Sequence, residues 1–178
     1  MQTLRNIFLI GPMGSGKTAV GKCLAGLSGL LFVDSDDEIV SRTGAEIPLI
    51  FEKEGEIGFR ERECGVIADL TAQDGVVLST GGGAILSPKN REVLRTRGVV
   101  VYLETSVAQQ VSRIRSGKGR PLLTGGDPMQ RLTELMAHRR PLYAEIAHLT
   151  VQTDRRRVRS VAEQIMRELI TTNRILKV

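Results

Sequence analysis

A glycine-rich segment near the start of the chain constrains its fold more than any other feature. The sequence GPMGSGKT occupies residues 11–18 and matches the pattern G-x-x-x-x-G-K-[ST]. It follows a short apolar run at residues 7–10 and precedes a stretch with helical character, which is the strand, loop and helix setting that the motif requires. Glycines let successive backbone N–H groups turn toward phosphate, and the positive end of the helix adds to the attraction. The chain is therefore expected to bind the phosphates of a nucleotide.

Short apolar runs and helical stretches alternate along the whole chain. Five runs rich in β-branched residues predict parallel strands that are buried on both faces, at residues 7–10, 31–33, 76–78, 99–103 and 149–151. Helices are predicted at residues 17–27, 37–42, 56–72, 88–97, 106–115, 128–146 and 158–170. Strand and helix in turn predict an α/β sandwich that binds its ligands at the carboxyl ends of the strands.

The composition fits a single domain over residues 1–178. A chain of 178 residues, of which 41% are hydrophobic, is long enough to bury about two-thirds of its unfolded surface. No apolar run approaches the roughly 20 residues that a membrane helix needs, and residues 7–10 are too few for the core of a signal peptide. The two cysteines, Cys23 and Cys64, have no metal-binding or redox spacing with each other or with the two histidines. We therefore expect a cytoplasmic protein without a membrane partner.

The net charge of +5 raises the question of a nucleic-acid partner. The chain has no Trp, four Phe and two Tyr, and its basic residues are not interleaved with aromatic ones, which is poor material for stacking bases. Arginine binds carboxylate and phosphate through a fork of N–H donors, so its abundance fits small anionic substrates better. A solvated basic surface accounts for many of the other arginines. Nucleic acid is therefore not an expected partner.

Two polar segments follow predicted strands, at the edge of the sheet where ligands bind. Asp34, Ser35 and Asp36 follow the second strand, where one carboxylate can face a metal while the other faces a second pocket. An alternative role for Asp36 is the N-cap of the helix predicted from residue 37. The sequence STGGG at residues 79–83 follows the third strand, and its glycines either admit another molecule close to the backbone or form an ordinary flexible turn. Together with the phosphate loop, these segments indicate a phosphoryl acceptor beside the nucleotide.

A phosphate loop does not by itself say how the nucleotide is used. A GTPase-type switch needs an Asn-Lys-x-Asp segment after a late strand, and the sequence contains none. A regulatory ATP-binding module stays open on the loop alone. The acceptor-side residues favour catalysis.

Eight segments, taken in order along the chain, resemble those of the shikimate kinase family. They are RNIFLIGPMGSGKT, DSDDEI, SRTG, EGEIGFRERE, STGGG, VVVYLE, GRPLL and RRPLY, and the resemblance runs from residue 5 to about residue 164. The phosphate loop is shared with many kinases, whereas DSD, GFR, GGG and RPLL in this order are more specific. The resemblance implies a three-layer α/β/α P-loop kinase fold similar to adenylate kinase. It includes a five-stranded parallel sheet, a substrate-binding helical region at about residues 34–63 and a mobile lid at about residues 112–127.

The resemblance also implies a reaction that uses ATP and Mg²⁺. Members of the family phosphorylate the 3-hydroxyl of shikimate, a step toward chorismate and the aromatic amino acids. The nucleotide phosphates are assigned to six consecutive residues: Gly14, Ser15, Gly16, Lys17, Thr18 and Ala19. Thr18 would bind Mg²⁺, Asp34 would lie near the metal through water, and Lys17 would also take part in catalysis. Arg113 and Arg156 would flank the adenine.

On the acceptor side, the resemblance assigns Asp36 to the shikimate hydroxyls and to the role of the base. Arg60 and Arg139 would bind the carboxylate, and the backbone of Gly82 would contact the ring. Arg120, within the lid sequence at residues 117–123, would contact the nucleotide and reach the transferring phosphoryl group. The chemistry agrees with these roles, because a substrate with one carboxylate and three hydroxyls needs a cationic fork at one end and acceptors at the other.

Spacing along the chain bears on three of these assignments. Glu63 lies three residues after Arg60 on the same predicted helix face, where it can orient the guanidinium. Arg140 is nearly as good a candidate as Arg139 from spacing alone, and Arg139 is preferred because it occupies the family position before x-Pro-Leu-Tyr. The basic run around Arg156 also fits a solvated surface.

Two alternatives to a shikimate kinase stay open. A related carbohydrate kinase, such as a gluconate kinase, would share the phosphate loop and the lid but not the combination of Asp36, Arg60 and three glycines. A non-catalytic homologue would bind ATP and a partner without turnover. A monomer is expected from the resemblance alone.

Overall fold

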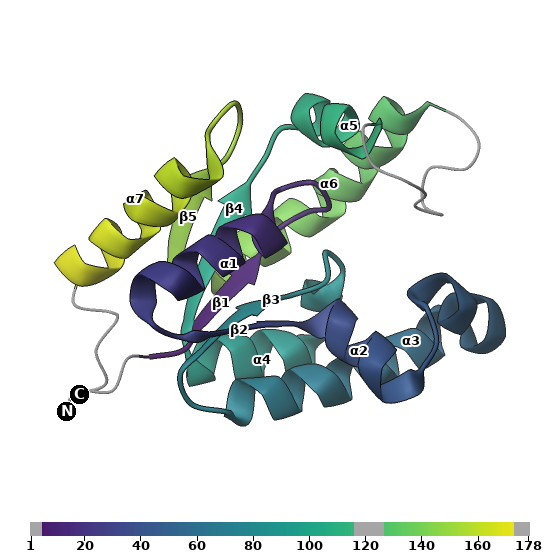
Figure 1. Ribbon diagram of the computed structural model, residues 1–178. Helices are drawn as coiled ribbons and strands as arrows, with labels where there is room; N and C mark the ends of the chain where they lie inside the picture. Colours follow the sequence, from purple (N-terminus) through teal and green to yellow (C-terminus); the bar gives the residue numbers. More distant parts are fainter. Residues whose placement is uncertain (1–4, 116–126, 173–178) are drawn as a thin grey trace.

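A five-stranded parallel sheet forms the centre of the protein (Figure 1). The computed structural model describes residues 5–115 and 127–172. The strands are β1 (Ile7–Ile10), β2 (Leu31–Asp34), β3 (Val76–Ser79), β4 (Val99–Glu104) and β5 (Leu149–Gln152). They lie in the order β2-β3-β1-β4-β5, and each neighbouring pair is parallel. The predicted parallel sheet is confirmed, and each predicted strand extends at most one residue further.

Helices cover both faces of this sheet. One face is covered by α1 (Lys17–Ser28) and α7 (Val158–Thr171). The other face is covered by α3 (Ile47–Ala72), α4 (Pro88–Arg97) and α6 (Pro128–Ile146). The shorter elements are α2 (Ser35–Thr43), α5 (Val107–Arg115) and a 3-10 turn, η1 (Ala84–Leu86). No helix within the described ranges is long and apolar enough to cross a membrane.

The two layers of helices enclose two separate cores. Successive side chains of a strand point to opposite faces of the sheet, so the middle strand β1 contributes to both cores. Ile7 and Leu9 pack with α1 and α7, whereas Phe8 and Ile10 pack with α3, α4 and α6. All four of these residues are fully buried, which makes β1 a rigid support for the loop that follows it.

The two edge strands are less buried than predicted. Leu31 of β2 is 62% exposed, and none of the four residues of β2 is buried. In β5 only Val151 is buried. The prediction of strands buried on both faces is therefore wrong for β2 and β5. Each edge strand has a neighbour on one side only, and a short apolar run does not reveal which strand will lie at the edge.

The helical region between β2 and β3 differs most from the prediction. The helix predicted at residues 56–72 is only the second part of α3, which starts at Ile47 and bends at Gly55, where φ is 70° and ψ is −174°. The first part was missed because it is short and its N-cap, Glu46, makes no side-chain capping bond. Helix α2 begins at Ser35, two residues before the predicted start.

The strand order brings the predicted ligand-binding segments to one edge of the sheet. The phosphate loop follows β1, residues 34–36 follow or end β2, and the three glycines follow β3. Because β2, β3 and β1 are consecutive neighbours and all parallel, their carboxyl ends lie side by side. Ligands of open parallel sheets bind at this edge.

Candidate active site

The phosphate loop turns sharply between β1 and α1. Gly14 and Gly16 have φ values of 78° and 91°, which side chains other than hydrogen disfavour. The N–H of Ser15 donates to the carbonyl of Pro12 over 3.2 Å and closes the turn. Helix α1 starts directly afterwards, so its first N–H groups face the loop. The loop therefore presents backbone N–H donors and a helix N-terminus to an anion.

Lys17 is held over this loop. Its Nζ donates to the carbonyl oxygens of Gly11 and Pro12, each over 2.8 Å, and only 9% of the residue is exposed. The first turn of α1 continues with Thr18 and Ala19, which are exposed. An ammonium group at this position neutralises charge on phosphate oxygens bound by the loop.

Thr18 and Asp34 form a pair of oxygen donors at the base of the loop. The Thr18 hydroxyl donates to Asp34 Oδ2 over 3.0 Å. In nucleotide sites Mg²⁺ takes one or two protein oxygens and completes its shell with phosphates and water. The Thr18 hydroxyl and the Asp34 carboxylate are therefore suitable oxygen ligands for Mg²⁺ that is bound together with a nucleotide.

Asp34 also caps helix α2, a role that the sequence suggested for Asp36. Asp34 Oδ1 accepts the N–H of Asp36 over 3.0 Å, and Asp36 lies inside the first turn of α2. The N-cap prediction for Asp36 is wrong because the helix starts two residues earlier than predicted. The Asp36 carboxylate lies instead beside the glycine turn, since a Cβ added to Gly81 would come within 2.9 Å of Asp36 Oδ1.

The three glycines at residues 81–83 are required by close neighbours and not by their backbone angles, because none of them has a positive φ. A Cβ on the first glycine would lie 2.7 Å from Glu63 Oε1, and one on the second would lie 3.3 Å from the backbone nitrogen of Met13 in the phosphate loop. A Cβ on the third would lie 2.7 Å from Arg60 Cζ. The glycine turn is thus the point at which the phosphate loop and the charged side chains of α3 converge.

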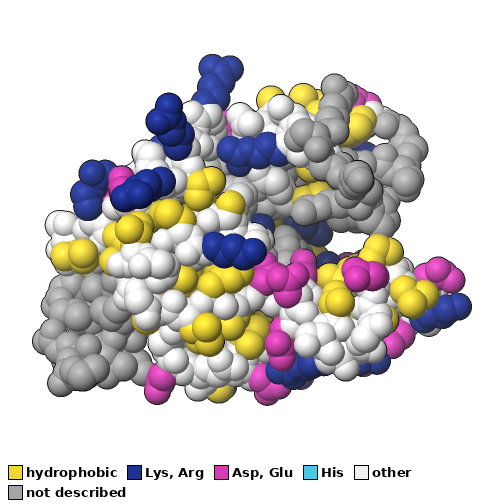
Figure 2. Space-filling view, viewed as in Figure 1, with side chains coloured by type: hydrophobic (Ala, Val, Ile, Leu, Met, Phe, Trp, Pro, Cys, Tyr) yellow, Lys and Arg dark blue, Asp and Glu magenta, His cyan; other side chains and the backbone are white. Residues whose placement is uncertain are grey.

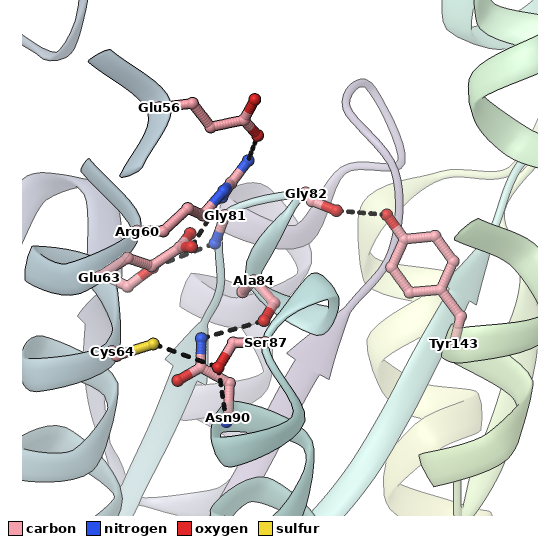
Figure 3. Close-up of polar contacts among 11 residues, drawn as sticks. Glu56, Arg60, Glu63, Cys64, Gly81, Gly82, Ala84, Ser87, Asn90 and Tyr143 are labelled. Atoms are coloured by element: carbon pink, nitrogen blue, oxygen red, sulfur yellow. Dashed lines mark hydrogen bonds and ion pairs between the residues drawn. The ribbon is translucent and has the colours of Figure 1, made fainter. Parts of the chain in front are cut away.

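Arg60 reaches this turn from α3 and is fixed by two carboxylates (Figure 3). Its Nη1 donates to Glu63 Oε2 over 2.7 Å, as the three-residue spacing predicts, and its Nη2 lies 3.4 Å from Glu56 Oε1. Glu63 is fully buried, and burial raises the pKa of its carboxyl, although the positive charge of Arg60 acts against this shift. Loss of the arginine would leave a buried carboxylate without its partner, which is costly.

Arg139 approaches from the opposite side, on α6. It is 8% exposed, whereas the neighbouring Arg140 is exposed. Burial raises the pKa of the Glu63 carboxyl, and the positive charge of Arg139 acts against this rise, as that of Arg60 does. Tyr143 lies one turn later on α6, and its hydroxyl donates to the carbonyl of Gly82 over 2.5 Å. Of the two neighbouring arginines, the structure therefore buries Arg139 and leaves Arg140 exposed, as the preference for Arg139 requires.

The two arginines assigned to the adenine both donate to backbone carbonyls at the end of β5. Arg113 donates to the carbonyls of Gly14 in the phosphate loop and of Thr153, over 2.7 and 3.0 Å. Arg156 donates to the carbonyl of Gln152 over 3.1 Å. The sequence did not reveal that Arg113 ties this turn to the phosphate loop.

The surface is hollowed between the α2–α3 region and the end of the molecule that carries α5 (Figure 2). Lys or Arg side chains lie in this hollow, and Asp or Glu side chains line it on the side of α2 and α3. The predicted lid falls largely on residues outside the described ranges, and Arg120 is one of them. The described part of the site combines cationic and acidic groups, which suits a substrate with both a carboxylate and hydroxyls.

Two residues of the site were not predicted from the sequence. Ser35 is fully buried, and its hydroxyl accepts the N–H of Gly81 over 3.0 Å. Tyr143 is also fully buried and holds the next residue of the same turn. A signal existed in both cases: Ser35 separates the two aspartates, and Tyr143 lies four residues after Arg139, on the same helix face.

Replacing Gly83 with alanine should weaken binding of the acceptor by displacing Arg60. Gly83 has φ −96° and ψ 1°, which alanine tolerates, so the clash falls on the guanidinium and not on the backbone. Hydrogen bonds to charged groups contribute about 1.5–3 kcal/mol, so we expect KM for the acceptor to rise at least about tenfold. Steady-state kinetics at saturating ATP would measure this.

Gly65→Ala is the matched control for this change. Gly65 lies on the same helix as Arg60, and a Cβ there meets no atom within 4 Å. The control should keep normal kinetics and gain up to about 1 kcal/mol of stability, because alanine favours a helix interior. An unchanged KM in a folded Gly83→Ala protein would contradict the proposed position of Arg60.

The chain is similar to known proteins over nearly its whole length. A sequence profile described as shikimate kinase matches residues 13–170. The chain belongs to the shikimate kinase family. A shikimate kinase of Acinetobacter baylyi is 54% identical over 170 residues, covering 96% of this chain and 94% of the relative. The solved structure of a shikimate kinase from Acinetobacter baumannii in complex with shikimate has a TM-score of 0.93 at 51% identity, covering 96% of this chain and 95% of that one.

A gluconokinase from Sinorhizobium meliloti shares the fold with this shikimate kinase family member. Its TM-score is 0.66 at 18% identity, covering 97% of this chain and 95% of that one. At this identity the likeness shows a common fold and nothing about the acceptor. The predicted family and the P-loop kinase fold are confirmed, and the comparisons favour shikimate over gluconate as the acceptor.

Proposed function

We propose that this protein transfers the γ-phosphoryl group of ATP to the 3-hydroxyl of shikimate, giving shikimate 3-phosphate and ADP in the pathway to chorismate and the aromatic amino acids. Membership of the shikimate kinase family carries the reaction. The structural observation that supports it is the convergence of the phosphate loop, Asp36 and Arg60 on one glycine turn. All three lie so close to the turn that a Cβ added to one of its glycines would contact them.

The donor side of the reaction is supplied by the phosphate loop. Its N–H groups and Lys17 bind the phosphates and stabilise the charge that spreads over the transferring group. Thr18 and Asp34 would hold Mg²⁺, Thr18 directly and Asp34 through water. When bound, Mg²⁺ neutralises negative charge on the phosphate oxygens.

The acceptor side is supplied by α2, α3, α6 and the glycine turn. Arg60 and Arg139 bind the carboxylate of shikimate, and the backbone of Gly82 contacts its ring. Asp36 accepts a hydrogen bond from the 3-hydroxyl and takes its proton. The bond from the hydroxyl oxygen to the γ-phosphorus forms while the bond to the ADP oxygen breaks, so that ADP leaves with the electron pair.

Two further sets of contacts complete the proposal. Arg113 and Arg156 flank the adenine, which agrees with the hydrogen bonds that both side chains make to carbonyls at the end of β5. Arg120, outside the described residues, contacts the nucleotide and stabilises the transferring phosphoryl group when the lid closes. Lid closure excludes water, which would otherwise accept the phosphoryl group.

We further propose that the protein works as a monomer in the cytoplasm and binds neither nucleic acid nor membranes. Its basic residues are not interleaved with aromatic ones, as stacking of bases would require. A substrate as small as shikimate needs only the groups that this one chain supplies.

The product identifies the reaction directly. Incubation of the purified protein with ATP, Mg²⁺ and shikimate should release ADP only when shikimate is present. Phosphorus–proton correlation spectra of the product should connect the new phosphate to the proton on C3. A phosphate on another carbon would overturn the proposed position of Asp36, and ADP release independent of shikimate would overturn the function.

Replacing Arg60 with lysine should mainly raise KM for shikimate. Lysine keeps the charge but loses the fork that binds Glu63 and a carboxylate at the same time. We expect KM to rise at least about tenfold, in line with a lost hydrogen bond between charged groups, while kcat stays within about threefold. Initial rates at saturating ATP and varied shikimate would separate the two constants.

Arg62→Lys is the control, because Arg62 lies two residues away on α3 and makes a similar pair with Glu54 on the exposed surface. Exposed pairs contribute about 0–1 kcal/mol, so this change should leave both constants near normal. Arg120→Ala should show the opposite signature to Arg60→Lys, a lower kcat with little change in KM for shikimate. Exchanged signatures would refute this division of roles.

A further inference from the structure

The glycine turn at residues 81–83 is closed by its own backbone. The carbonyl of Gly81 accepts the N–H of Ala84 over 3.1 Å, and the carbonyl of Gly83 accepts the N–H of Leu86 over 3.0 Å. These bonds lead into η1 and leave the middle carbonyl, that of Gly82, without a backbone donor among the described residues. The carbonyl of Gly82 therefore depends on a side chain for its hydrogen bond.

That side chain is Tyr143, whose hydroxyl donates to the Gly82 carbonyl over 2.5 Å. Tyr143 is fully buried, and its ring stacks on Tyr102 with the ring centres 5.0 Å apart. Burial raises the pKa of Tyr143 above its ordinary value, so the hydroxyl keeps its proton at neutral pH and stays a donor. Packing and protonation together make Tyr143 a fixed point beside a flexible turn.

The turn needs a side chain that holds it in place, because the peptide group that carries the Gly82 carbonyl joins two glycines, Gly82 and Gly83. Glycine occupies both signs of φ at little cost, so the peptide between Gly82 and Gly83 could rotate without a steric penalty from side chains. The C=O and N–H of a trans peptide point in opposite directions, and the structure contains no cis peptide in its described ranges. Whatever holds the Gly82 carbonyl therefore also sets the direction of the Gly83 N–H.

Figure 3 shows Gly82 with Tyr143 on one side and Arg60 on the other. With its carbonyl held on the Tyr143 side, the peptide turns the Gly83 N–H toward the Arg60 side, where the guanidinium lies against Gly83. Neither the N–H of Gly82 nor that of Gly83 forms a hydrogen bond with any residue that the structure describes. The Gly83 N–H is thus a donor without an acceptor among the described residues, and it points away from Tyr143 and toward the side of Arg60.

We propose that Tyr143 is a positioning residue for the acceptor: its hydroxyl prevents the Gly82–Gly83 peptide from flipping and so keeps the Gly83 N–H available to an oxygen of shikimate. This inference rests on the proposed function. Ser35 supports it from the other side of the turn, because its buried hydroxyl accepts the N–H of Gly81. Tyr143 itself touches neither substrate nor nucleotide in this account.

The test compares Tyr143→Phe with the wild type. Loss of one neutral hydrogen bond allows the peptide to rotate, so KM for shikimate should rise about fivefold, while kcat and KM for ATP stay within about twofold. A purely structural role would lower the melting temperature without separating the two substrates. Equal changes in both KM values, or no change in a folded protein, would overturn the proposal.

Tyr102→Phe is the matched control, since it removes the same atom from the ring that stacks on Tyr143 but not from the bond to the glycine turn. It should leave KM for shikimate within about twofold of the wild type. Should Tyr143→Phe not fold, Ser35→Ala provides the second arm and should also raise KM for shikimate selectively. An absence of shikimate turnover in the wild type would instead refute the function itself, so the two failures are distinguishable.

Discussion

Replacing Lys17 with alanine is expected to lower kcat at least about a hundredfold while the protein stays folded. The ammonium group lies over the phosphate loop, held by the carbonyls of Gly11 and Pro12, and we propose that it stabilises charge that develops during phosphoryl transfer. Its removal takes away that stabilisation and weakens nucleotide binding as well. Steady-state kinetics and thermal melting on the same preparation would measure both effects.

Lys22→Ala provides the control for Lys17. Lys22 lies on the same helix, is exposed, and has its Nζ 5.7 Å from the centre of the Phe32 ring, away from the phosphate loop. This control should keep normal turnover, because exposed charges far from the reaction contribute little. A folded Lys17→Ala protein with kcat within about tenfold of the wild type would show that Lys17 does not act on the transferring group.

Asp36→Asn should lower kcat at least about a hundredfold, because an amide cannot take the proton of the 3-hydroxyl and general-base catalysis typically contributes about 100- to 10,000-fold. The structure sharpens this test. Asp34 caps α2, so the change at Asp36 removes no cap and only one charge from the first turn of the helix. The stability should fall by no more than about 0.3–1 kcal/mol.

Asp37→Asn controls for that loss of charge, since Asp37 lies in the same first turn and is exposed. It should reproduce the small change in stability and keep full turnover. Binding of ATP should be normal in both proteins. If Asp36→Asn turned over shikimate at a nearly normal rate, Asp36 would not be the base, and Asp34 would be the next residue to examine.

The phosphate loop, with the strand before it and the helix after it, could be predicted from the sequence because it is local. Residues 11–18 are contiguous and match one sequence pattern, and the strand before them and the helix that starts within them are marked by apolar residues. The pairing of Arg60 with Glu63 is local as well, since three residues along a helix bring side chains together. Patterns of this kind need no knowledge of the tertiary fold.

The remaining features depend on contacts between distant parts of the chain. The bond from Tyr143 to Gly82 joins residues 61 positions apart, and that from Ser35 to Gly81 joins residues 46 positions apart. The reason for three glycines was equally hidden, because it lies in close neighbours from the phosphate loop, α2 and α3 and not in the backbone angles of the turn. The cap of α2 was misassigned for a local reason, an error of two residues in the start of a helix.

The central claim is the choice of acceptor, and ADP release with shikimate and with gluconate, measured side by side under saturating ATP and Mg²⁺, tests it most directly. Both compounds carry a carboxylate and hydroxyls, so the comparison isolates the shape of the acceptor site. Polar groups placed for one substrate remain unpaired with another, and we therefore predict that kcat/KM for shikimate exceeds that for gluconate at least about a hundredfold. Equal rates, a preference for gluconate, or no ADP release with either compound would contradict the account.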